Sequence, residues 1–217
     1  MNSHQLQNLK SNFREIISES SLSTKVLLSG SLLFYPLCLL APSLTESYFT
    51  IHSSKILPPN FWIWTLLTYP FIETSIIALS SGLICIVIAS RLLEPLWGNT
   101  ELAKFLVVSC IGAGVVSGFA YLFVYCLTLN EEFLYSRYFN GLVAIKGAVL
   151  VGLKQTRGED FLLKNPMLSI QISQVPFILL VLFWGLSCLT GLISTEYCTL
   201  FSSGIYAAWF YLQKCLY

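Results

Sequence analysis

Few side chains in this sequence can do chemistry, and one of them lies where a charge is costly. Lys146 falls inside an apolar run, and a charged side chain within a membrane span normally faces a cavity or a partner. There, its ammonium group could bind an anionic substrate or a lipid headgroup. Alternatively, the long aliphatic side chain of Lys146 lets its ammonium group reach the membrane surface, or the ammonium group pairs with an acid such as Glu73.

Nucleophilic catalysis would need a serine or cysteine beside a base, because a hydroxyl alone is a weak nucleophile. Serines precede glycine at Ser80-Ser81-Gly82 and Ser202-Ser203-Gly204, but the two histidines, His4 and His52, lie outside the apolar runs. Lys146 is the remaining base, so a Ser–Lys hydrolase is the enzyme alternative. We expect the serines to bond to the backbone of their own helices or to a neighbouring helix.

The seven cysteines show no metal-binding or disulfide pattern, because none forms a Cys-x-x-Cys pair and most lie in apolar runs. They are expected to act as small buried hydrophobic side chains. The sequence also has no GxxxxGK, GxGxxG or HExxH motif, so it predicts neither a metal site nor a cofactor.

The composition points to a membrane protein. Of the 217 residues, 55% are hydrophobic and only 11% are charged, against about 25% charged in soluble domains. The net charge is +1 and the mean hydropathy is +0.72. These values exclude a disordered chain, a nucleic-acid binder and almost any ordinary soluble enzyme. The length suits a single bundle of about six membrane spans.

Six apolar runs are predicted to form spans, at 26–41, 75–93, 104–127, 140–153, 175–194 and 198–213. The fourth run is short: its 14 residues reach about 21 Å, less than the roughly 30 Å hydrocarbon core. It must therefore be shielded by its neighbours or line an aqueous cavity. A tight connection at 195–197 predicts that the last two spans form an antiparallel hairpin.

The segments outside the spans are also assigned. Residues 1–24 are predicted to form a cytosolic amphipathic segment, residues 25–213 the membrane domain, and residues 214–217 a short cytosolic tail. The aromatic segment 60–72 is expected to be an interfacial helix or loop, because tryptophan and tyrosine favour the membrane–water interface.

The basic residues predict the orientation. If the amino end is cytosolic, only Lys55 and Arg137 fall on the opposite side. The cytosolic segments then hold nine basic residues: Lys10, Arg14, Lys25, Arg91, Lys104, Lys154, Arg157, Lys164 and Lys214. This positive-inside bias predicts that both termini are cytosolic.

Two stretches carry a family resemblance. The phrase Thr68-Tyr69-Pro70-Phe71 follows an aromatic loop containing Trp64, and the second span ends with Leu93-Glu94-Pro95-Leu96-Trp97-Gly98, a pattern that resembles rhomboids. Together with Val151-Gly152-Leu153-Lys154-Gln155-Thr156 and Trp209-Phe210-Tyr211-Leu212, the sequence resembles the transmembrane protein 115 family, a catalytically inactive branch of the rhomboid-like superfamily. The signature residues are Trp64, Glu94, Gly98, Lys154 and Gln155.

The resemblance implies an all-α, six-span rhomboid-like bundle without its catalytic groups. Rhomboid proteases use a serine at the start of the fourth span, and here that position falls on Asn140 or Val143. The sixth span has no histidine, and the second-span positions that assist catalysis fall near Ala78 and Gly82. We therefore expect no enzyme activity. Lys146, Asn140 and Val143 become candidates for contact with a client in the former catalytic cavity.

Gly114 and Gly118 in the third span form a small-residue face that allows two helices to approach closely. Packing within the chain is the favoured interpretation of this face. A homo-oligomer is the alternative.

By resemblance, the expected function is that of a pseudoprotease of the Golgi membrane that recognises or organises transmembrane client proteins. The family further implies a part in Golgi-to-ER retrograde vesicle transport and contact with the conserved oligomeric Golgi complex. The lipid bilayer is the other expected partner, and no nucleic-acid partner is expected. A small transporter or channel using the cavity around Lys146 is the alternative function.

Overall fold

The computed structural model describes residues 22–56, 62–159, 161–165, 168–191 and 193–215. Most of the predicted amphipathic segment 1–24, and residues 216–217 of the predicted tail, lie outside these ranges. The first described helix begins at Leu22, before the predicted start of the membrane domain, and the last ends at Cys215.

Helices make up most of the described chain. The longer ones are α2 (Leu22–Leu40), α6 (Ile76–Trp97), α7 (Asn99–Thr128), α8 (Val143–Arg157), α9 (Val175–Thr190) and α10 (Thr195–Cys215). The shorter ones are α3 (Pro42–Phe49), α4 (Ser53–Ile56), α5 (Thr65–Thr68), η1 (Tyr69–Phe71), η2 (Glu132–Ser136) and η3 (Ile172–Gln174). The interfacial segment predicted at 60–72 forms α5 and η1 where it is described.

The all-α expectation needs one correction, because two small antiparallel sheets are present. Strand β1 (Ile51–His52) pairs with β2 (Tyr138–Phe139), and Ile51 lies opposite Phe139. Strand β3 (Phe161–Asn165) pairs with β4 (Leu168–Gln171). The hydropathy pattern did not indicate either pair, because strands of two to five residues are too short to show alternation.

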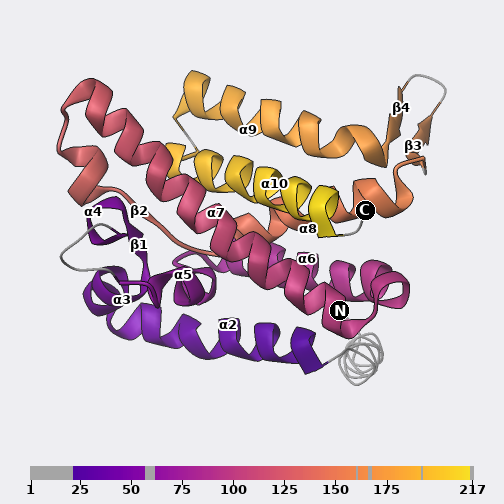
Figure 1. The fold of residues 1–217 in the computed structure, drawn as a ribbon, viewed down its shortest axis with the longest axis horizontal. Helices are drawn as coiled ribbons and strands as arrows, with labels where there is room; N and C mark the ends of the chain where they lie inside the picture. Colours follow the sequence, from indigo (N-terminus) through magenta and orange to yellow (C-terminus); the bar gives the residue numbers. More distant parts are fainter. Residues whose placement is uncertain (1–21, 57–61, 160, 166–167, 192, 216–217) are drawn as a thin grey trace, which may run out of the picture.

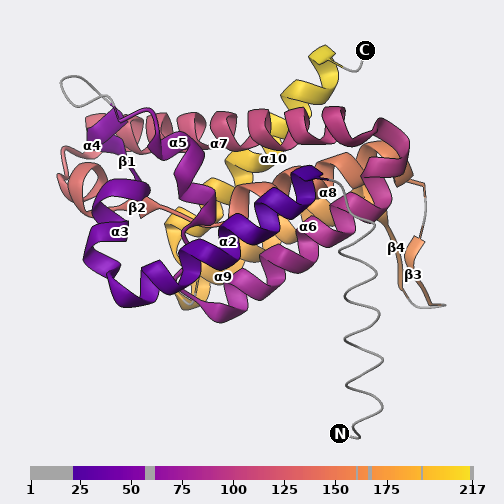
Figure 2. The same cartoon turned by 90° about the horizontal axis from the view of Figure 1, so that it is seen from below.

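The long helices run along the molecule between two different ends (Figure 1). One end gathers α3, α4, β1 and β2, and the other carries the β3–β4 hairpin and the last turns of α10. The view at right angles shows the same separation (Figure 2). We call the first end, made of residues 42–56 and 130–139, the cap.

Three described helical segments are long and apolar enough to cross a membrane: α6, α7 and the continuous stretch Ile172–Thr190. Thr24–Leu40 is a shorter apolar helix. The predicted fourth and sixth spans correspond to α8 and α10, whose bounds overlap the predicted runs. The chain is therefore a helical membrane protein, and the count of six spans stays a prediction.

Two predicted boundaries were wrong. The turn between the last two long helices lies between Gly191 and Ser194, before the predicted 195–197, because Gly191 adopts a φ of +64° and ends α9. Helix α8, predicted to start at residue 140, begins at Val143, because Gly141 has a φ of +89° and turns the chain just before it.

Helix α8 lies at the centre of the molecule. It packs against α6, α7 and α10, and most of its first ten residues are buried. Small residues make this possible: a Cβ on Gly147 would lie 2.7 Å from the carbonyl oxygen of Phe201, and one on Gly204 would lie 2.5 Å from that of Ala144. The neighbouring helices thus shield a helix that is too short to cross the hydrocarbon core unaided.

Candidate functional site

The start of α8 is held by a carboxylate from a distant part of the chain. Glu73, just before α6, accepts a hydrogen bond from the backbone N–H of Leu142 at 2.9 Å. The N–H of Gly141 donates to the carbonyl of Tyr69 at 2.9 Å. These bonds satisfy amide groups at the helix entrance that would otherwise lack acceptors. They fix the segment between α2 and α6, the first loop, against α8.

Glu73 is almost completely enclosed, with 4% of its surface exposed. Burial raises the pKa of its carboxyl group, while the Leu142 bond and the charge of Lys146 lower it less. A Cβ on Gly141 would lie 2.6 Å from Glu73 Oε1, so this close approach requires glycine. Glu73 therefore has a positioning role at the helix start.

Lys146 lies one turn into α8 and is half-buried. Its Nζ donates to the carbonyl of Ala78 on α6 at 3.1 Å and lies 5.7 Å from the centre of the Tyr197 ring. In the part of the chain that the structure describes, no ion pair within 4.0 Å joins Lys146 to Glu73. The expected pairing with Glu73 is therefore a charge interaction without direct contact, because the Glu73 carboxylate is engaged by Leu142.

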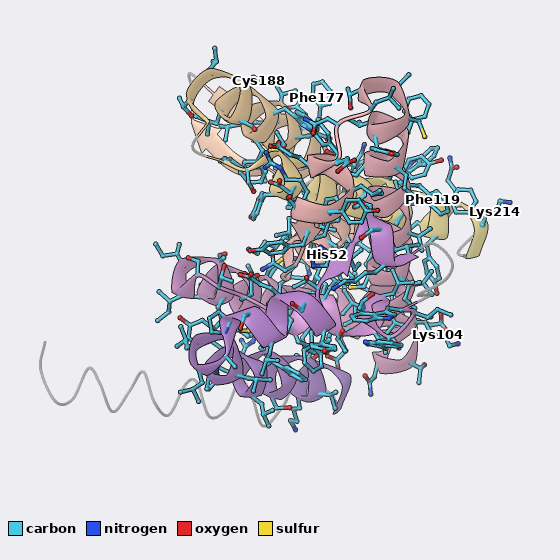
Figure 3. All side chains as sticks on the ribbon, turned by 90° about the vertical axis from the view of Figure 1, so that its left-hand side faces the viewer. His52, Lys104, Phe119, Phe177, Cys188 and Lys214 are labelled. Atoms are coloured by element: carbon cyan, nitrogen blue, oxygen red, sulfur yellow. The ribbon has the colours of Figure 1, made fainter. Side chains whose placement is uncertain are left out.

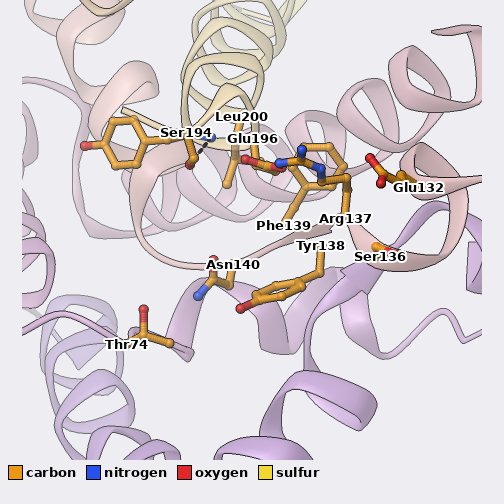
Figure 4. A pocket seen from close by; sticks show the side chains of 11 residues that line it. Thr74, Glu132, Ser136, Arg137, Tyr138, Phe139, Asn140, Ser194, Glu196 and Leu200 are labelled. Atoms are coloured by element: carbon orange, nitrogen blue, oxygen red, sulfur yellow. Dashed lines mark hydrogen bonds and ion pairs between the residues drawn. The ribbon is translucent and has the colours of Figure 1, made fainter. Parts of the chain in front are cut away.

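A polar pocket of about 560 Å³ lies beside the start of α8 (Figure 4). Its lining comes from the segment around β2, from the first turns of α10 and from Thr74. Arg137 and Glu196 form an ion pair of 2.5 Å in its wall, with the Glu196 side chain only 14% exposed. Asn140, one of the predicted client-contact residues, lines this pocket.

Residues 132–139 of the cap form part of the pocket wall, and the rest of the cap packs behind Tyr138. His52 Nε2 lies 3.1 Å from the carbonyl oxygen of Glu46, and the His52 ring lies 5.7 Å from that of Tyr138. The Tyr138 hydroxyl donates to Glu46 Oε1 at 3.1 Å, and Tyr138 also lines the pocket. Burial lowers the pKa of His52. Figure 3 labels His52 among the side chains at this end.

Of the positions expected to correspond to rhomboid catalytic groups, Asn140 lines the pocket, and the other three are apolar or engaged in packing. Val143 is 2% exposed and belongs to a buried cluster with Phe139 and Phe201. Ala78 contributes its carbonyl to Lys146, and a Cβ on Gly82 would meet Leu142 at 2.5 Å. The site thus keeps an open polar pocket, while Val143 is enclosed.

The serines that were considered as nucleophiles bond to their own helices, as expected. The four side chains donate to backbone carbonyls three or four residues earlier: Ser80 to Ile77, Ser81 to Ala78, Ser202 to Cys198 and Ser203 to Leu200. Among the described residues, no hydrogen bond joins a serine, threonine or cysteine side chain to His52 or Lys146. That part of the chain also holds no group of three His, Cys, Asp or Glu able to bind a metal.

The signature residues lie at three different places. Trp64 donates from Nε1 to the carbonyl of Tyr48 at 3.1 Å and stacks on Trp62. Glu94 accepts a hydrogen bond from Ser90 at 2.6 Å, and Gly98, with a φ of +80°, separates α6 from α7. The two others, Lys154 and Gln155, are exposed near the end of α8.

The glycines of α7 pack against the first loop. A Cβ on Gly114 would lie 2.8 Å from Ile51 and 2.9 Å from Leu66, and one on Gly118 would lie 2.3 Å from Ile56. This face is therefore covered within the chain.

Several residues of the site were not singled out by the sequence reasoning. Arg137 was considered only for its charge, Glu196 only as part of the predicted connection at 195–197, and Glu73 only as a possible partner of Lys146, while Tyr138 was given no role. The Asn140-Gly141 pair before an apolar run was a usable turn signal. It did not indicate which distant acid would meet the helix start.

These features define a helical integral membrane protein with a short, enclosed central helix and a polar pocket at its entrance. The family described as eukaryotic integral membrane protein (DUF1751) matches residues 25–214, and the chain belongs to this family.

The similar proteins agree with this assignment. The chain is 35% identical to transmembrane protein 115 of Bos taurus over 91% of its length, and 34% identical to that of Homo sapiens. It is 28% identical to rhomboid-like protein 19 of Arabidopsis thaliana over 78% of its length. The chain spans about half the length of these relatives, with 55% of the two transmembrane protein 115 chains and 53% of the plant protein covered.

Proposed function

We propose that this protein is a non-catalytic, rhomboid-like pseudoprotease that recognises or organises other membrane proteins. One observation carries the proposal: the entrance of α8 keeps an open polar pocket beside Asn140, whereas Val143 is buried among apolar side chains. A serine hydrolase needs a hydroxyl in contact with a base. No hydroxyl in contact with a base is found among the described residues. We therefore assign the pocket a role in binding other membrane proteins and not in catalysis.

The exposed surface of α9 supports a role in contacts within the membrane. Its principal neighbours are α8, α10 and the η3 turn before it, and it is held to α10 through Phe183 and Trp184. Much of its remaining surface is apolar and open, including Phe177 at 70% exposed. A transmembrane segment of a client could cover this surface, with its polar end at the pocket.

The proposed arrangement in the membrane has six spans, with α2, α8 and α10 added to the three long apolar helices and both termini cytosolic. The ends of the molecule fit this orientation: Lys55 and Arg137 lie in the cap, and Lys154, Arg157 and Lys214 lie at the carboxyl ends of α8 and α10. By family resemblance we further propose the Golgi membrane, a part in Golgi-to-ER retrograde transport, and contact with the conserved oligomeric Golgi complex.

The test is photo-crosslinking in native membranes. A photoreactive phenylalanine analogue replaces Asn140 in the pocket, and a second variant carries it at the exposed Phe177 on α9. The matched control carries it at Phe119 on α7, which is 56% exposed. We expect adducts with membrane-spanning proteins at Asn140 and Phe177 but not at Phe119, with no cleavage of the captured proteins.

Two results would contradict the proposal. Equal adducts at all three positions would indicate unspecific collisions within the membrane. Labelling of the chain by a fluorophosphonate probe, abolished by one serine substitution, would reveal a hydrolase after all. Co-localisation with a Golgi marker in a eukaryotic cell tests the proposed compartment separately.

A further inference from the structure

A polar notch interrupts the apolar surface near the start of α6. Lys146 Nζ and Ser81 Oγ both donate to the carbonyl oxygen of Ala78, at 3.1 and 2.9 Å. Ser81 is exposed, whereas Ala78 and Lys146 are half-buried. We call these three residues the Ala78 notch. Two donors therefore converge at one partly open point.

The notch lies on a face of α6 that is otherwise apolar and open. Ile77, Ser81, Ile84 and Ile88 recur at helical spacing, which places them on one side of the helix. The isoleucines are 76%, 60% and 40% exposed. A side so apolar and so uncovered faces lipid in a membrane protein, and Ser81 is the polar member of this stripe.

The charge at the notch is not balanced by a close acid. Within the described residues, no carboxylate lies within 4.0 Å of Lys146 Nζ. Glu73 acts on Lys146 through its charge but without contact, because its carboxylate is buried and accepts the Leu142 N–H, and burial raises its pKa. One hydrogen bond from the ammonium group goes to Ala78, and an ammonium has three N–H donors. An anion is therefore the ligand that this point favours.

The depth of the notch indicates which anion can reach it. Helix α6 has 22 residues, which at 1.5 Å each span about 33 Å, close to the roughly 30 Å thickness of the hydrocarbon core. Ala78 is near the first residue of α6, so an upright helix places the notch a few ångströms inside the hydrocarbon boundary. Phospholipid phosphates lie just outside that boundary, within reach of a lysine side chain.

We propose that the Ala78 notch binds the phosphate group of a phospholipid from the leaflet in which α6 begins. Lys146 supplies the charged contact through the N–H groups that Ala78 does not use. Ser81 supplies a second donor when its single O–H turns from the Ala78 carbonyl to the phosphate, and an acyl chain lies along Ile77, Ile84 and Ile88. The headgroup then extends toward Tyr197, whose ring lies beneath the ammonium group and also lines the polar pocket. This site adjoins the proposed client pocket at Tyr197, but its lipid ligand does not depend on that proposal.

The experiment measures lipid binding to the full chain, purified and delipidated in detergent, by native mass spectrometry. The probes are dioleoyl-phosphatidylcholine, dioleoyl-glycerol, which lacks phosphate, and glycerol phosphate, which lacks acyl chains. We expect the phospholipid to bind best, with affinity about tenfold weaker in Lys146→Met and more modestly weaker in Ser81→Ala. Lys146→Arg should keep most of the binding, and Lys154→Met, on the same helix but exposed, should match the unchanged chain.

Other outcomes would overturn the proposal. Equal phospholipid binding by the unchanged chain and Lys146→Met would remove Lys146 from the site. Glycerol phosphate binding as tightly as the phospholipid would assign the notch to a soluble anion.

A second measurement does not depend on changing Lys146. A photoreactive residue at Ser81 in native membranes should give adducts with the mass of a phospholipid. Adducts with proteins alone would instead make this face a protein contact and would contradict the lipid site. Because client capture is tested at Asn140 and Phe177, either proposal can fail without the other.

Discussion

Glu73 shows how one side chain can determine the position of a helix that is far away in sequence. Its carboxylate accepts the Leu142 N–H, and Gly141 leaves the space for that approach. A buried amide without an acceptor costs about 1–3 kcal/mol, so the contact is worth most as a constraint on geometry. It sets where α8 begins and therefore where Val143 and Lys146 lie.

Replacing Gly141 by alanine is expected to destabilise the fold more than the same change at Gly191. Both glycines have positive φ, which costs an alanine about 1–2 kcal/mol. Only at Gly141 would the added Cβ also meet a neighbour, Glu73, whereas the space around Gly191 is open. Thermal unfolding in detergent should show the larger loss for Gly141→Ala. Equal losses would mean that Glu73 moves aside without cost.

His52 is expected to make the cap sensitive to acid. Burial lowers the pKa of His52 in the folded chain, below the ordinary value of about 6.5. The unfolded chain therefore takes up this proton first as pH falls, and the stability due to the neutral imidazole is lost from about pH 6.5 downward. His52→Gln should flatten the dependence of the unfolding temperature on pH in this range. The same slope in both proteins would place the acid sensitivity elsewhere.

At the scale of residues, the sequence indicated which groups are chemically unusual but not their partners. Lys146 stood out because a charge inside an apolar run is costly. Its acceptor is a backbone carbonyl, and every residue has one, so no pattern of side chains could identify Ala78. Glu73 and Gly141 meet only because two segments fold together.

At the scale of elements, the crossing of α8 and α10 depends on glycine at the contact. Gly147 faces the backbone of Phe201, and Gly204 faces that of Ala144. Backbone atoms cannot turn away as a flexible side chain can. The two helices therefore stay close only while both positions lack a Cβ.

Gly147→Ala and Gly204→Ala are each expected to lower stability by about 1–3 kcal/mol, because the helices must separate to admit the methyl group. Gly185→Ala on α9 is the control: a Cβ there meets nothing within 4 Å, and alanine favours the helix by about 0.5–1 kcal/mol. Unfolding temperatures in detergent compare the three variants. The prediction fails if Gly185→Ala is as destabilising as the other two.

Elements were easier to predict than their ends. Long apolar runs predicted α6, α7 and α9 correctly, because an uninterrupted apolar run of about 20 residues is typical of a membrane-spanning helix. The start of α8 and the turn before α10 were misplaced by about three residues. In both cases a glycine with positive φ sets the boundary, and hydropathy carries no information on φ.

At the scale of the whole molecule, the two ends differ in charge and in structure. The cap holds Lys55 and Arg137, and the opposite end gathers the carboxyl ends of α8 and α10. In the proposed orientation the second end faces the cytosol. The sequence predicted this separation from the basic residues alone, since the bias depends on where charges fall between spans.

Single cysteines placed in a cysteine-free variant test this orientation. We expect Lys154→Cys to react with a membrane-impermeant maleimide only after sealed membrane vesicles with their cytosolic face inside are opened. Lys55→Cys should react in intact vesicles of the same kind. Both cysteines reacting from the same side would exclude an odd number of spans between them and contradict the topology.

The β1–β2 pairing has a consequence for the order of assembly during synthesis. Tyr138 and Glu46, which bond across the cap, are 92 positions apart. Closing so long a loop is entropically unfavourable until the intervening helices are in place. Strand β1 in the first loop therefore stays unpaired until α6 and α7 have been inserted and β2 has been synthesised. A ribosome-bound chain arrested before residue 138 should show the first loop open to protease, and a chain extended past α8 should show it protected.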